Sequence, residues 1–428
     1  MTLSFGPMES KSAPSMLSRW HRTPLYLRIL GALLLGLVVG VLYGPGAAWL
    51  AIPGKLVLRL LGALAPALIL FAIIQALIQT HFSPGTTGRL IRLLILNTLV
   101  AIGIGLLVAD VIQPGKWSPD LHQSIGQPAA KAAGAPDMLM QFLDNIPRSV
   151  LGPLADDGKV IGVIFLAVGI GMALRRHAQR PLTTVKDWVD TGLEVLITML
   201  HWIIDLVPLA VFGIVASIVG TKGFSPFQAL GAFVLAVLCA LVLQAAYYLI
   251  RIRFGSWVHP MDLFRGGRDA FWMAFSTSSS AITMPVTYEC LRTKVKLREK
   301  SATLGALVGA NFNNDGTALY EAMAALFVSQ MLAAQGLGIE LTLTQQLLVV
   351  VTSVIASVGA AGIPEAGLVT MTLVFNAVGL PTEYIALLLP VDWFLDRCRT
   401  TINVMGDMNV SCLLDGKTPE DSTPIPAT

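Results

Sequence analysis

Residues 390–412 read PVDWFLDRCRTTINVMGDMNVSC and place a row of polar side chains in an otherwise strongly apolar chain. In hydrocarbon an ionised Asp or Arg is costly, so a membrane helix carries such groups where they pair, face a cavity or bind a ligand. The polar residues recur at the spacing of one helix face, with about 3.6 residues per turn. We therefore expect one wall of a binding site, formed by Asp392, Asp396, Arg399, Thr400, Asn403 and Asp407.

A structural ion-pair ladder is the alternative interpretation of this row. Asp392 and Asp396 could neutralise Arg399 at helical spacing without binding anything. Asn403 and Asp407 favour a binding site, because they have no basic partner on the same face and need another donor or a cation. A carboxylate one turn from an amide offers the hard oxygen ligands that small cations prefer.

The composition is that of a polytopic membrane protein. The chain has 428 residues, 54% hydrophobic and 13% charged, and its mean hydropathy of +0.71 is too high for a soluble protein of this size. The formal net charge of +3 gives no reason to expect a nucleic-acid partner. Four scattered cysteines lack metal-ligand spacing, so we expect no disulfide, no zinc and no cofactor. The polar, basic N-terminus leads into a full-length span, unlike a cleavable signal peptide.

Apolar segments approaching the 20 or so residues that a membrane helix needs predict six spans. They cover residues 26–42, 57–78, 93–112, 160–174, 195–219 and 229–250, with a long polar connection at 113–158. Two later segments, 270–290 and 347–375, are interrupted by FSTSSSAITMP and SVGAAGIPEAG. Such breaks leave backbone groups unpaired in lipid unless they line a cavity. Both segments therefore predict re-entrant hairpins, a pattern that marks the binding site of many secondary transporters; a Ser-rich kink is the alternative for the first.

Basic residues predict the orientation of the spans. By the positive-inside rule the clusters that alternate with the spans are cytoplasmic, and so are both termini. The cluster after the sixth span consists of Arg251, Arg253, Arg265 and Arg268. Five more basic residues between 292 and 300 place both ends of the first hairpin on the cytoplasmic side. Residues 301–396 contain no Lys or Arg, which suits a second hairpin that enters from outside.

A seventh span, at residues 304–331, carries the polar run GANFNNDGTALYEA. Asn-Asp-Gly is an ordinary turn signal, but a lipid-exposed turn inside the membrane would leave its backbone unpaired. We therefore expect local unwinding at Gly316, with freed carbonyls beside Asp315 that coordinate a cation.

With these motifs the chain resembles the dicarboxylate/amino acid:cation symporter family, the glutamate and aspartate transporters, over nearly its whole length. The resemblance rests on STSSSAITMP, NDGTALYEA, GAAGIPEAGLVTM and DWFLDRCRTTINVMGD, which are more similar to the animal excitatory amino-acid transporters than to the archaeal aspartate transporters. It implies an all-α fold of eight transmembrane helices and two re-entrant hairpins, built from inverted repeats. It also implies a homotrimer in the lipid bilayer of a plasma membrane, here expected to be a bacterial inner membrane.

The family's elevator mechanism implies a division of the chain into a scaffold and a transport domain that moves across the membrane as a rigid body. The scaffold would comprise helices one and two (25–80) and four and five (159–222), the latter pair preceded by an extracellular connection and the broken start of helix four (114–158). Helix three (85–113) and residues 226–414 would form the transport domain. The latter range would hold helix six, hairpin one (258–291), helix seven (301–331), hairpin two (342–377) and helix eight (383–414). Cytoplasmic tails would cover 1–24 and 415–428.

Substrate roles are implied residue by residue. Arg399 would hold the side-chain carboxylate of glutamate or aspartate, a task suited to guanidinium, and Asp396 would receive the amino group. A plain dicarboxylic acid would leave Asp396 unpaired, so an amino acid is the preferred small-molecule substrate. The remaining implied contacts are Ser279, Ser280, Thr317, Ile363, Gly367, Thr400 and Asn403.

The resemblance also implies cation sites. One Na⁺ would lie among Gly309, Asn313, Asn403 and Asp407, a second near Asn311, Ser357, Val358 and Ala360, and a third near Asn97, Thr98, Asn313 and Asp315. Glu321 matches the position linked to proton symport in the animal transporters, where a buried carboxyl could cross in its neutral form. A Glu that only hydrogen-bonds within the core is the alternative. Countertransport of K⁺ stays open.

Several positions depart from the family's usual residues. Asn314 stands where Met is usual, Asn311 replaces Thr, Ala281 replaces Ser, Leu94 replaces Tyr, and Glu365 replaces Gln or Gly. These departures leave open the number of coupled Na⁺ ions and the choice between Na⁺ and H⁺.

Together the patterns predict a secondary active importer of L-glutamate and L-aspartate, driven by Na⁺ with H⁺ as a further coupling ion. The alternatives are a proton-coupled dicarboxylate or amino-acid symporter and an anion-conducting, channel-like member of the family. No His-rich metal motif, P-loop or nucleophile elbow occurs in the sequence, so we do not expect an enzyme.

Overall fold

The computed structural model describes residues 23–79, 87–117, 160–176, 183–334, 336, 340–359 and 366–418. All regular elements in these ranges are helical, in agreement with the predicted all-α class. The first half contains α2 (Leu25–Tyr43), η1 (Gly44–Ala51), α3 (Ile52–Gln79), α4 (Thr87–Ile112), η2 (Pro114–Lys116), α7 (Val160–Arg176), α8 (Thr183–Ile204), α9 (Val207–Lys222) and α10 (Ser225–Gly255). The second half contains α11 (Pro260–Gly266), α12 (Arg268–Thr277), α13 (Ser280–Glu289), η4 (Cys290–Lys294), α14 (Glu299–Thr303), η5 (Leu304–Val308), α15 (Gly309–Phe312), α16 (Asp315–Ala334), α17 (Leu343–Gly359), α18 (Ala366–Ala377), η6 (Thr382–Leu387) and α19 (Leu389–Asp415).

Several helices of the described ranges are long enough to span a membrane. Five helical stretches are long and apolar enough to cross a bilayer: Leu25–Gln75, Gly88–Lys116, Thr184–Lys222, Ser225–Gly255 and Glu299–Ala334. The predicted fifth span lies within the stretch Thr184–Lys222, which consists of two helices, α8 and α9, separated at Asp205 and Leu206. Pro208 in the first turn of α9 explains the break, because proline cannot donate a helical hydrogen bond and restricts the residue before it.

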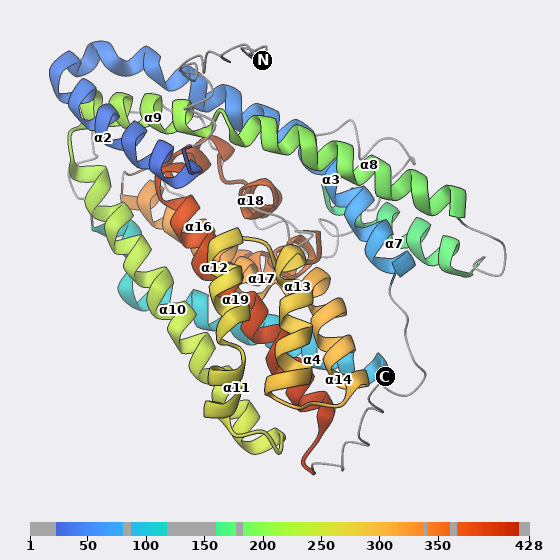
Figure 1. Cartoon of the computed structure of the whole chain (residues 1–428). Helices are drawn as coiled ribbons and strands as arrows, with labels where there is room; N and C mark the ends of the chain where they lie inside the picture. Colours follow the sequence, from blue (N-terminus) through green and yellow to red (C-terminus); the bar gives the residue numbers. More distant parts are fainter. Residues whose placement is uncertain are drawn as a thin grey trace, which may run out of the picture.

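The helices pack in two groups, which Figure 1 shows as a blue and green layer, with α2, α3, α7, α8 and α9, beside a bundle that is mainly yellow to red and includes the cyan α4 and the yellow-green α10. In the first group α2 packs on α9, and α3 packs on α7, α8 and α9. Gly36 and Gly40 follow the small-xxx-small spacing that brings membrane helices together. A methyl group at Gly36 would lie 2.8 Å from the carbonyl oxygen of Phe212 on α9, so the close approach of the two helices depends on glycine.

The second group surrounds α16 and α19, which contact each other and are covered by α4, α10, α12 and α18. The side chains of α16 are buried all round the helix, from Asp315 to Leu332. A helix without an exposed face lies in the interior of its domain. The polar residues of α16 are therefore enclosed by protein.

The segment of the first predicted hairpin forms two short helices, α12 and α13, that lie side by side; its re-entrant position in a membrane stays a prediction. The chain reverses at Ser278, which has a left-handed backbone (φ 52°), and at Ser279, whose hydroxyl accepts from the amide of Ile282 at 3.2 Å and caps α13. Serine is a favoured N-cap because its oxygen satisfies an amide that the first turn leaves unpaired. In the second hairpin α17 contacts α18, and its tip, with Ala360, Ile363 and Glu365, lies outside the described residues.

The seventh predicted span is interrupted, but not where we expected. The unwound residues are Asn313 and Asn314, between α15 and α16, whereas Gly316 lies in the first turn of α16. The amide of Gly316 donates to Asn403 Oδ1 at 2.8 Å, which fixes this turn against α19. The predicted unwinding at Gly316 is thus corrected to the two preceding asparagines.

Candidate functional site

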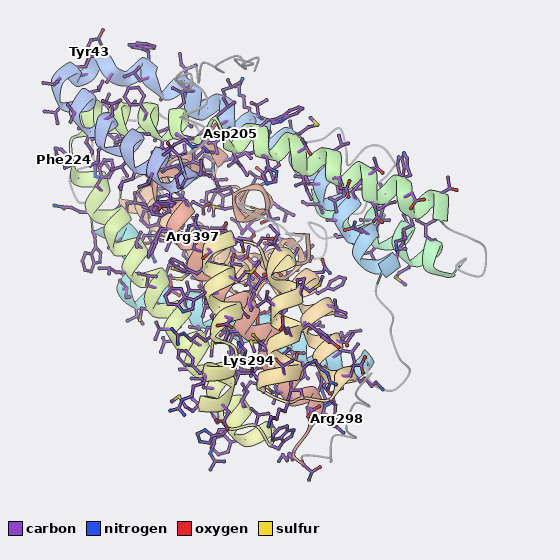
Figure 2. All side chains as sticks on the ribbon, in the orientation of Figure 1. Tyr43, Asp205, Phe224, Lys294, Arg298 and Arg397 are labelled. Atoms are coloured by element: carbon purple, nitrogen blue, oxygen red, sulfur yellow. The ribbon has the colours of Figure 1, made fainter. Side chains whose placement is uncertain are left out.

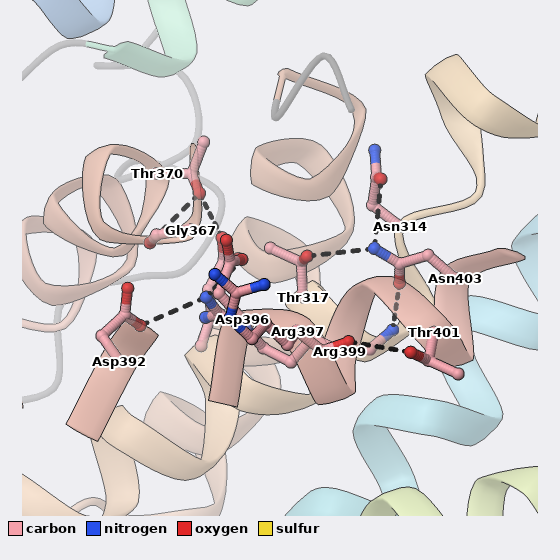
Figure 3. A network of polar contacts seen from close by, with 12 residues as sticks. Asn314, Thr317, Gly367, Thr370, Asp392, Asp396, Arg397, Arg399, Thr401 and Asn403 are labelled. Carbon is pink, nitrogen blue, oxygen red and sulfur yellow. Dashed lines mark hydrogen bonds and ion pairs between the residues drawn. The ribbon is translucent and has the colours of Figure 1, made fainter. Parts of the chain in front are cut away.

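The polar face of α19 is buried, as its helical spacing predicted. Each of its six members is at most 5% exposed: Asp392, Asp396, Arg399, Thr400, Asn403 and Asp407. Figure 3 shows part of this face, with Asp392, Asp396, Arg399 and Asn403, beside residues of α16 and α18. Since a buried charge is costly without a partner, the contacts of each group indicate what the site can bind.

Arg399 is fully buried and already holds two carboxylates. Its Nη2 lies 2.7 Å from Asp396 Oδ1 and 3.2 Å from Asp392 Oδ1, so the ion pairs of the alternative interpretation do form. The guanidinium also stacks 4.0 Å from the centre of the Tyr320 ring. However, Nε and Nη1 have no hydrogen-bond partner among the described residues. Arg399 therefore keeps donors for a further anion.

Gly367, at the start of α18, lies against the unused side of this guanidinium. A methyl group in its place would be 2.7 Å from Arg399 Nη1. Only a residue without a side chain lets the backbone of the second hairpin come this close. The structure thus brings together two of the predicted substrate residues.

Asn403 joins α19 to the unwound part of the seventh span. Its Oδ1 accepts from the amide of Gly316, and its Nδ2 lies 3.4 Å from both Asn314 Oδ1 and Thr317 Oγ1. These contacts are drawn in Figure 3. Asn403 and Thr317 are therefore neighbours, as the predicted substrate site requires.

At the first hairpin, Ser279 and Ser280 have different roles. Ser279 caps α13, whereas the hydroxyl of Ser280 is buried without a hydrogen-bond partner among the described residues. The preceding turn is anchored by Arg397, whose Nη1 donates to the carbonyls of Phe275 and Ser276 at 2.8 and 2.6 Å. We did not predict this contact of Arg397; its sequence signal is an extra arginine that follows Asp396 directly and therefore lies about 100° round the helix from it.

The first predicted cation group is assembled around Asp407. Its Oδ1 accepts from Asn313 Nδ2 at 3.2 Å, and a side chain at Gly309 would overlap the carboxylate. Asn313 Oδ1 is buried without a hydrogen-bond partner among the described residues. A carboxylate and a free amide oxygen beside a glycine backbone form a set of oxygens suited to a small cation.

The second predicted cation group is not brought together in the same way. Asn311 donates to the carbonyl of Leu307 on its own helix at 3.1 Å. The carbonyl of Ser357, a predicted ligand, instead accepts from Asn314 Nδ2 at 2.8 Å. The structure describes the backbone but not the side chain of Val358, and it does not describe Ala360. Asn314, an unusual residue for the family, therefore hydrogen-bonds to an oxygen that was predicted for Na⁺.

The third predicted group lies between α4, α10 and α16. Thr98 Oγ1 donates to Asp315 Oδ1 at 2.7 Å, and the Tyr248 hydroxyl donates to Oδ2 at 2.5 Å. Asn97 Oδ1 accepts from Arg251, a residue that we had counted among the cytoplasmic loop cations. Arg251 lies within the last turns of α10, and its guanidinium contacts a fully buried side chain; its cytoplasmic side stays a prediction.

Glu321, the predicted proton carrier, is fully buried on α16. Its Oε1 accepts from the hydroxyl of Thr370 on α18, and Oε2 has no hydrogen-bond partner among the described residues. The carboxyl group thus links α16 to the second hairpin. One of its oxygens stays free to carry a proton.

Carboxyl groups exceed basic groups in this interior. Six described carboxyl side chains are at most 5% exposed, and one of them, Asp415 at the end of α19, pairs with Arg298. The other five lie around α16 and the polar face of α19, and the arginines that contact this network are the buried Arg399 and the half-buried Arg251. The five are Asp315, Glu321, Asp392, Asp396 and Asp407. An excess of buried carboxylates is unstable unless cations or protons neutralise it.

Buried ionisable groups on interrupted helices, within a chain of apolar spans, define a membrane transporter of a charged solute. The comparison with protein families identifies the class more closely. The chain belongs to the sodium:dicarboxylate symporter family, whose model matches residues 25–417. It is thus a multi-pass secondary transporter and not an enzyme.

Several curated relatives are similar over most of the chain. A protein of Caenorhabditis elegans named "Excitatory amino acid transporter" is 30% identical over 94% of this chain and 89% of its own length. A second from the same organism, "Putative sodium-dependent excitatory amino acid transporter glt-4", is 28% identical over 89% and 88%. "Excitatory amino acid transporter 5" of Homo sapiens is 37% identical over 60% of this chain and 45% of its own length.

Proposed function

We propose that this protein imports L-glutamate or L-aspartate together with Na⁺ across a plasma membrane. The observation that carries the proposal is the fully buried guanidinium of Arg399, which holds Asp396 and keeps two nitrogens without hydrogen-bond partners in the part of the chain that the structure describes. A buried cation of this kind is stabilised when an anion accepts its remaining hydrogens. Membership of a sodium:dicarboxylate symporter family and the names of the relatives point to the same solute and ion.

The substrate would lie between α19, the first turn of α16 and the two hairpin tips. Its side-chain carboxylate would approach Arg399 beside Gly367, and its amino group would take over Asp396 from the guanidinium. The α-carboxylate would receive hydrogen bonds from Asn403 and from Ser280, whose hydroxyl has no partner among the described residues. Ser279, Thr317, Ile363 and Thr400 complete the proposed set.

The first proposed Na⁺ site is formed by Gly309, Asn313, Asn403 and Asp407. The oxygen of Asn313, which has no hydrogen-bond partner within the described ranges and lies beside the Asp407 carboxylate, supports this site. At the second group, near Asn311, Ser357, Val358 and Ala360, Na⁺ would have to displace Asn314 from the Ser357 carbonyl. The third group, at Asn97, Thr98, Asn313 and Asp315, already has a guanidinium beside it.

The proposed mechanism is an elevator in a homotrimer. Its scaffold would consist of α2, α3, α7, α8 and α9, and its transport domain of α4 and the helices from α10 to α19. The contacts within each group support this division. We further propose eight membrane helices and two hairpins that enter from opposite faces, with cytoplasmic termini in a bacterial inner membrane.

Proton coupling is a second candidate because of Glu321. Its Oε1 accepts from Thr370 of the second hairpin, and its other oxygen has no hydrogen-bond partner among the described residues. If this carboxyl crossed the membrane protonated, H⁺ would accompany or replace Na⁺. The two modes make different predictions for the driving gradient.

Uptake of labelled L-aspartate and L-glutamate into proteoliposomes separates these modes, with a Na⁺ gradient and a proton gradient imposed one at a time. Uptake driven by the Na⁺ gradient is the expected result. Uptake driven only by protons would transfer coupling to Glu321, and no uptake under either gradient would refute the proposed substrate. Replacement of Arg399 by Cys should abolish this uptake, and replacement of the exposed Arg268 by Cys is its matched control.

A further inference from the structure

We propose that Arg251 is a tethered cation that takes the place of one coupling Na⁺ at the buried junction of α4, α10 and α16. The inference rests on the proposed Na⁺-coupled transport and concerns how many ions accompany each substrate. Its starting point is that a cation ligand predicted from the family, Asn97, is bound to a guanidinium in this chain.

The carboxylate of Asp315 is the centre of this junction. It is 0% exposed, and its two oxygens accept from Thr98 at 2.7 Å and from Tyr248 at 2.5 Å. Two neutral hydroxyl donors orient the carboxylate but do not cancel its charge. A buried carboxylate needs a positive charge close by.

Arg251 is placed to provide that charge. It lies less than one helical turn after Tyr248 on α10, so both side chains are on the face of α10 that contacts α4. Its Nη1 donates to Asn97 Oδ1, and its guanidinium lies 5.4 Å from the centre of the Tyr247 ring. Asn97 and Thr98 are successive residues of α4, so the guanidinium and the Asp315 carboxylate are held by the same turn of α4 without a direct ion pair between them.

Arg251 is better placed than its neighbours on α10 to supply the positive charge near Asp315. The backbone carbonyl of Asn97 also accepts a hydrogen bond from Gln244 Nε2 at 3.5 Å, so two residues of α10 hold Asn97. Arg253, the next basic residue of α10, is exposed and lies on another face of the helix. Asp407 is the other carboxylate close to Asp315 and already has its own amide donor, Asn313.

A tethered charge changes the stoichiometry of transport. A Na⁺ ion beside Asp315 would be taken up and released in every cycle and would add to the driving force. The guanidinium compensates the same carboxylate but stays with the protein. If Arg251 only extended its head group towards the membrane surface, its removal would not change the number of Na⁺ ions transported with each substrate. That number therefore distinguishes a guanidinium that replaces Na⁺ from one that only reaches the surface.

The test replaces Arg251 by Met in the full-length chain and measures fluxes of ²²Na⁺ and labelled aspartate in proteoliposomes. We expect the ratio of Na⁺ to aspartate to rise by one and the Na⁺ dependence of uptake to become steeper. Arg251→Lys keeps the charge and should keep the wild-type ratio, as should the matched control Arg253→Met. A second change, Asp315→Asn, should return the Arg251→Met protein to the wild-type ratio.

An unchanged ratio in Arg251→Met, with Na⁺-driven uptake intact, would overturn the inference and leave the proposed function standing. Wild-type uptake that ignores Na⁺ would refute the proposed function instead. If Arg251→Met does not fold, Thr98→Val removes an oxygen from the junction without touching the guanidinium. Its Na⁺ to aspartate ratio should equal that of the wild type, whereas a loss of one Na⁺ would show that the ion binds beside Asp315 and would overturn the inference.

Discussion

Replacement of Asp407 by Asn tests the proposed Na⁺ site with the smallest change of shape. Asp407 is 1% exposed and accepts from Asn313 Nδ2 at 3.2 Å, and an asparagine oxygen can keep that hydrogen bond. What the substitution removes is the negative charge that would face a bound cation. The fold and the packing against Gly309 should therefore survive, and the effect should appear in Na⁺ binding.

The size of the effect follows from the burial of this carboxylate. Two unit charges 4 Å apart attract each other by about 4 kcal/mol at the dielectric constant typical near a protein surface. Removing one partner of a desolvated charge pair costs roughly 2–5 kcal/mol. Because asparagine keeps one oxygen ligand, we expect the lower part of that range, about 2–3 kcal/mol. At 1.4 kcal/mol per factor of ten, the half-saturating Na⁺ concentration should rise roughly 30- to 140-fold.

The assay is aspartate uptake into proteoliposomes at increasing Na⁺ concentration, with choline replacing Na⁺ to hold the ionic strength constant. Na⁺-dependent thermal stabilisation of the purified protein gives an independent measure. Asp262→Asn is the matched control, because Asp262 is exposed on α11. If the half-saturating Na⁺ concentration rose less than threefold in Asp407→Asn, or rose equally in the control, the assignment of Na⁺ to this carboxylate would be refuted.

Three further predictions concern the substrate site and the end of α19. Arg399→Cys should abolish uptake of acidic substrates but allow neutral amino acids to bind through Asp396, and retained aspartate affinity would contradict the role of Arg399. Gly367→Ala should raise the KM for aspartate about tenfold or more, a cost of at least 1.4 kcal/mol, because a methyl group there lies 2.7 Å from the guanidinium; an unaltered KM in uptake kinetics would count against it. Asp415→Ala should lower the free energy of unfolding by about 1.5–3 kcal/mol, measured by thermal denaturation, with Na⁺ dependence unchanged.

The last of these predictions depends on contacts at the end of α19. Asp415 accepts from Arg298 Nε at 3.0 Å through Oδ1 and from Trp257 Nε1 at 2.8 Å through Oδ2. The amide of Trp257 also donates to the carbonyl of Gly416 at 3.0 Å. Figure 2 shows Arg298 at this end of the molecule. A normal melting temperature in Asp415→Ala would mean that these hydrogen bonds add little to stability.

Helical spacing was enough to predict the buried polar face of α19 from the sequence. The spacing of Asp392, Arg399 and Asn403 fixes their common face once the segment is a helix. The first hairpin could also be predicted, because Ser278 and Ser279 interrupt an apolar run with residues that favour a turn and a cap. These features depend on local sequence alone.

Other features depend on contacts between segments far apart in the chain. Gly316 was the natural place to expect unwinding, but its amide bonds to Asn403 and keeps it in the first turn of α16. Asn314 stood out as an unusual residue, yet its partner on α17 could only be found in three dimensions. Arg251 follows an apolar segment as a cytoplasmic charge would, and only the packing of α10 on α4 turns it inward.

The charges of the interior explain why substrate and cation should bind together. Apart from Asp415, which pairs with Arg298, five buried carboxylates oppose the two guanidinium groups of Arg399 and Arg251, which leaves three uncompensated negative charges when all are ionised. An acidic amino acid adds one more, and burial of that charge is unfavourable without cations. Binding of Na⁺ at Asp407 therefore lowers the cost of binding the substrate. Because such coupling is reciprocal, aspartate must raise the affinity for Na⁺ by the same factor that Na⁺ raises the affinity for aspartate.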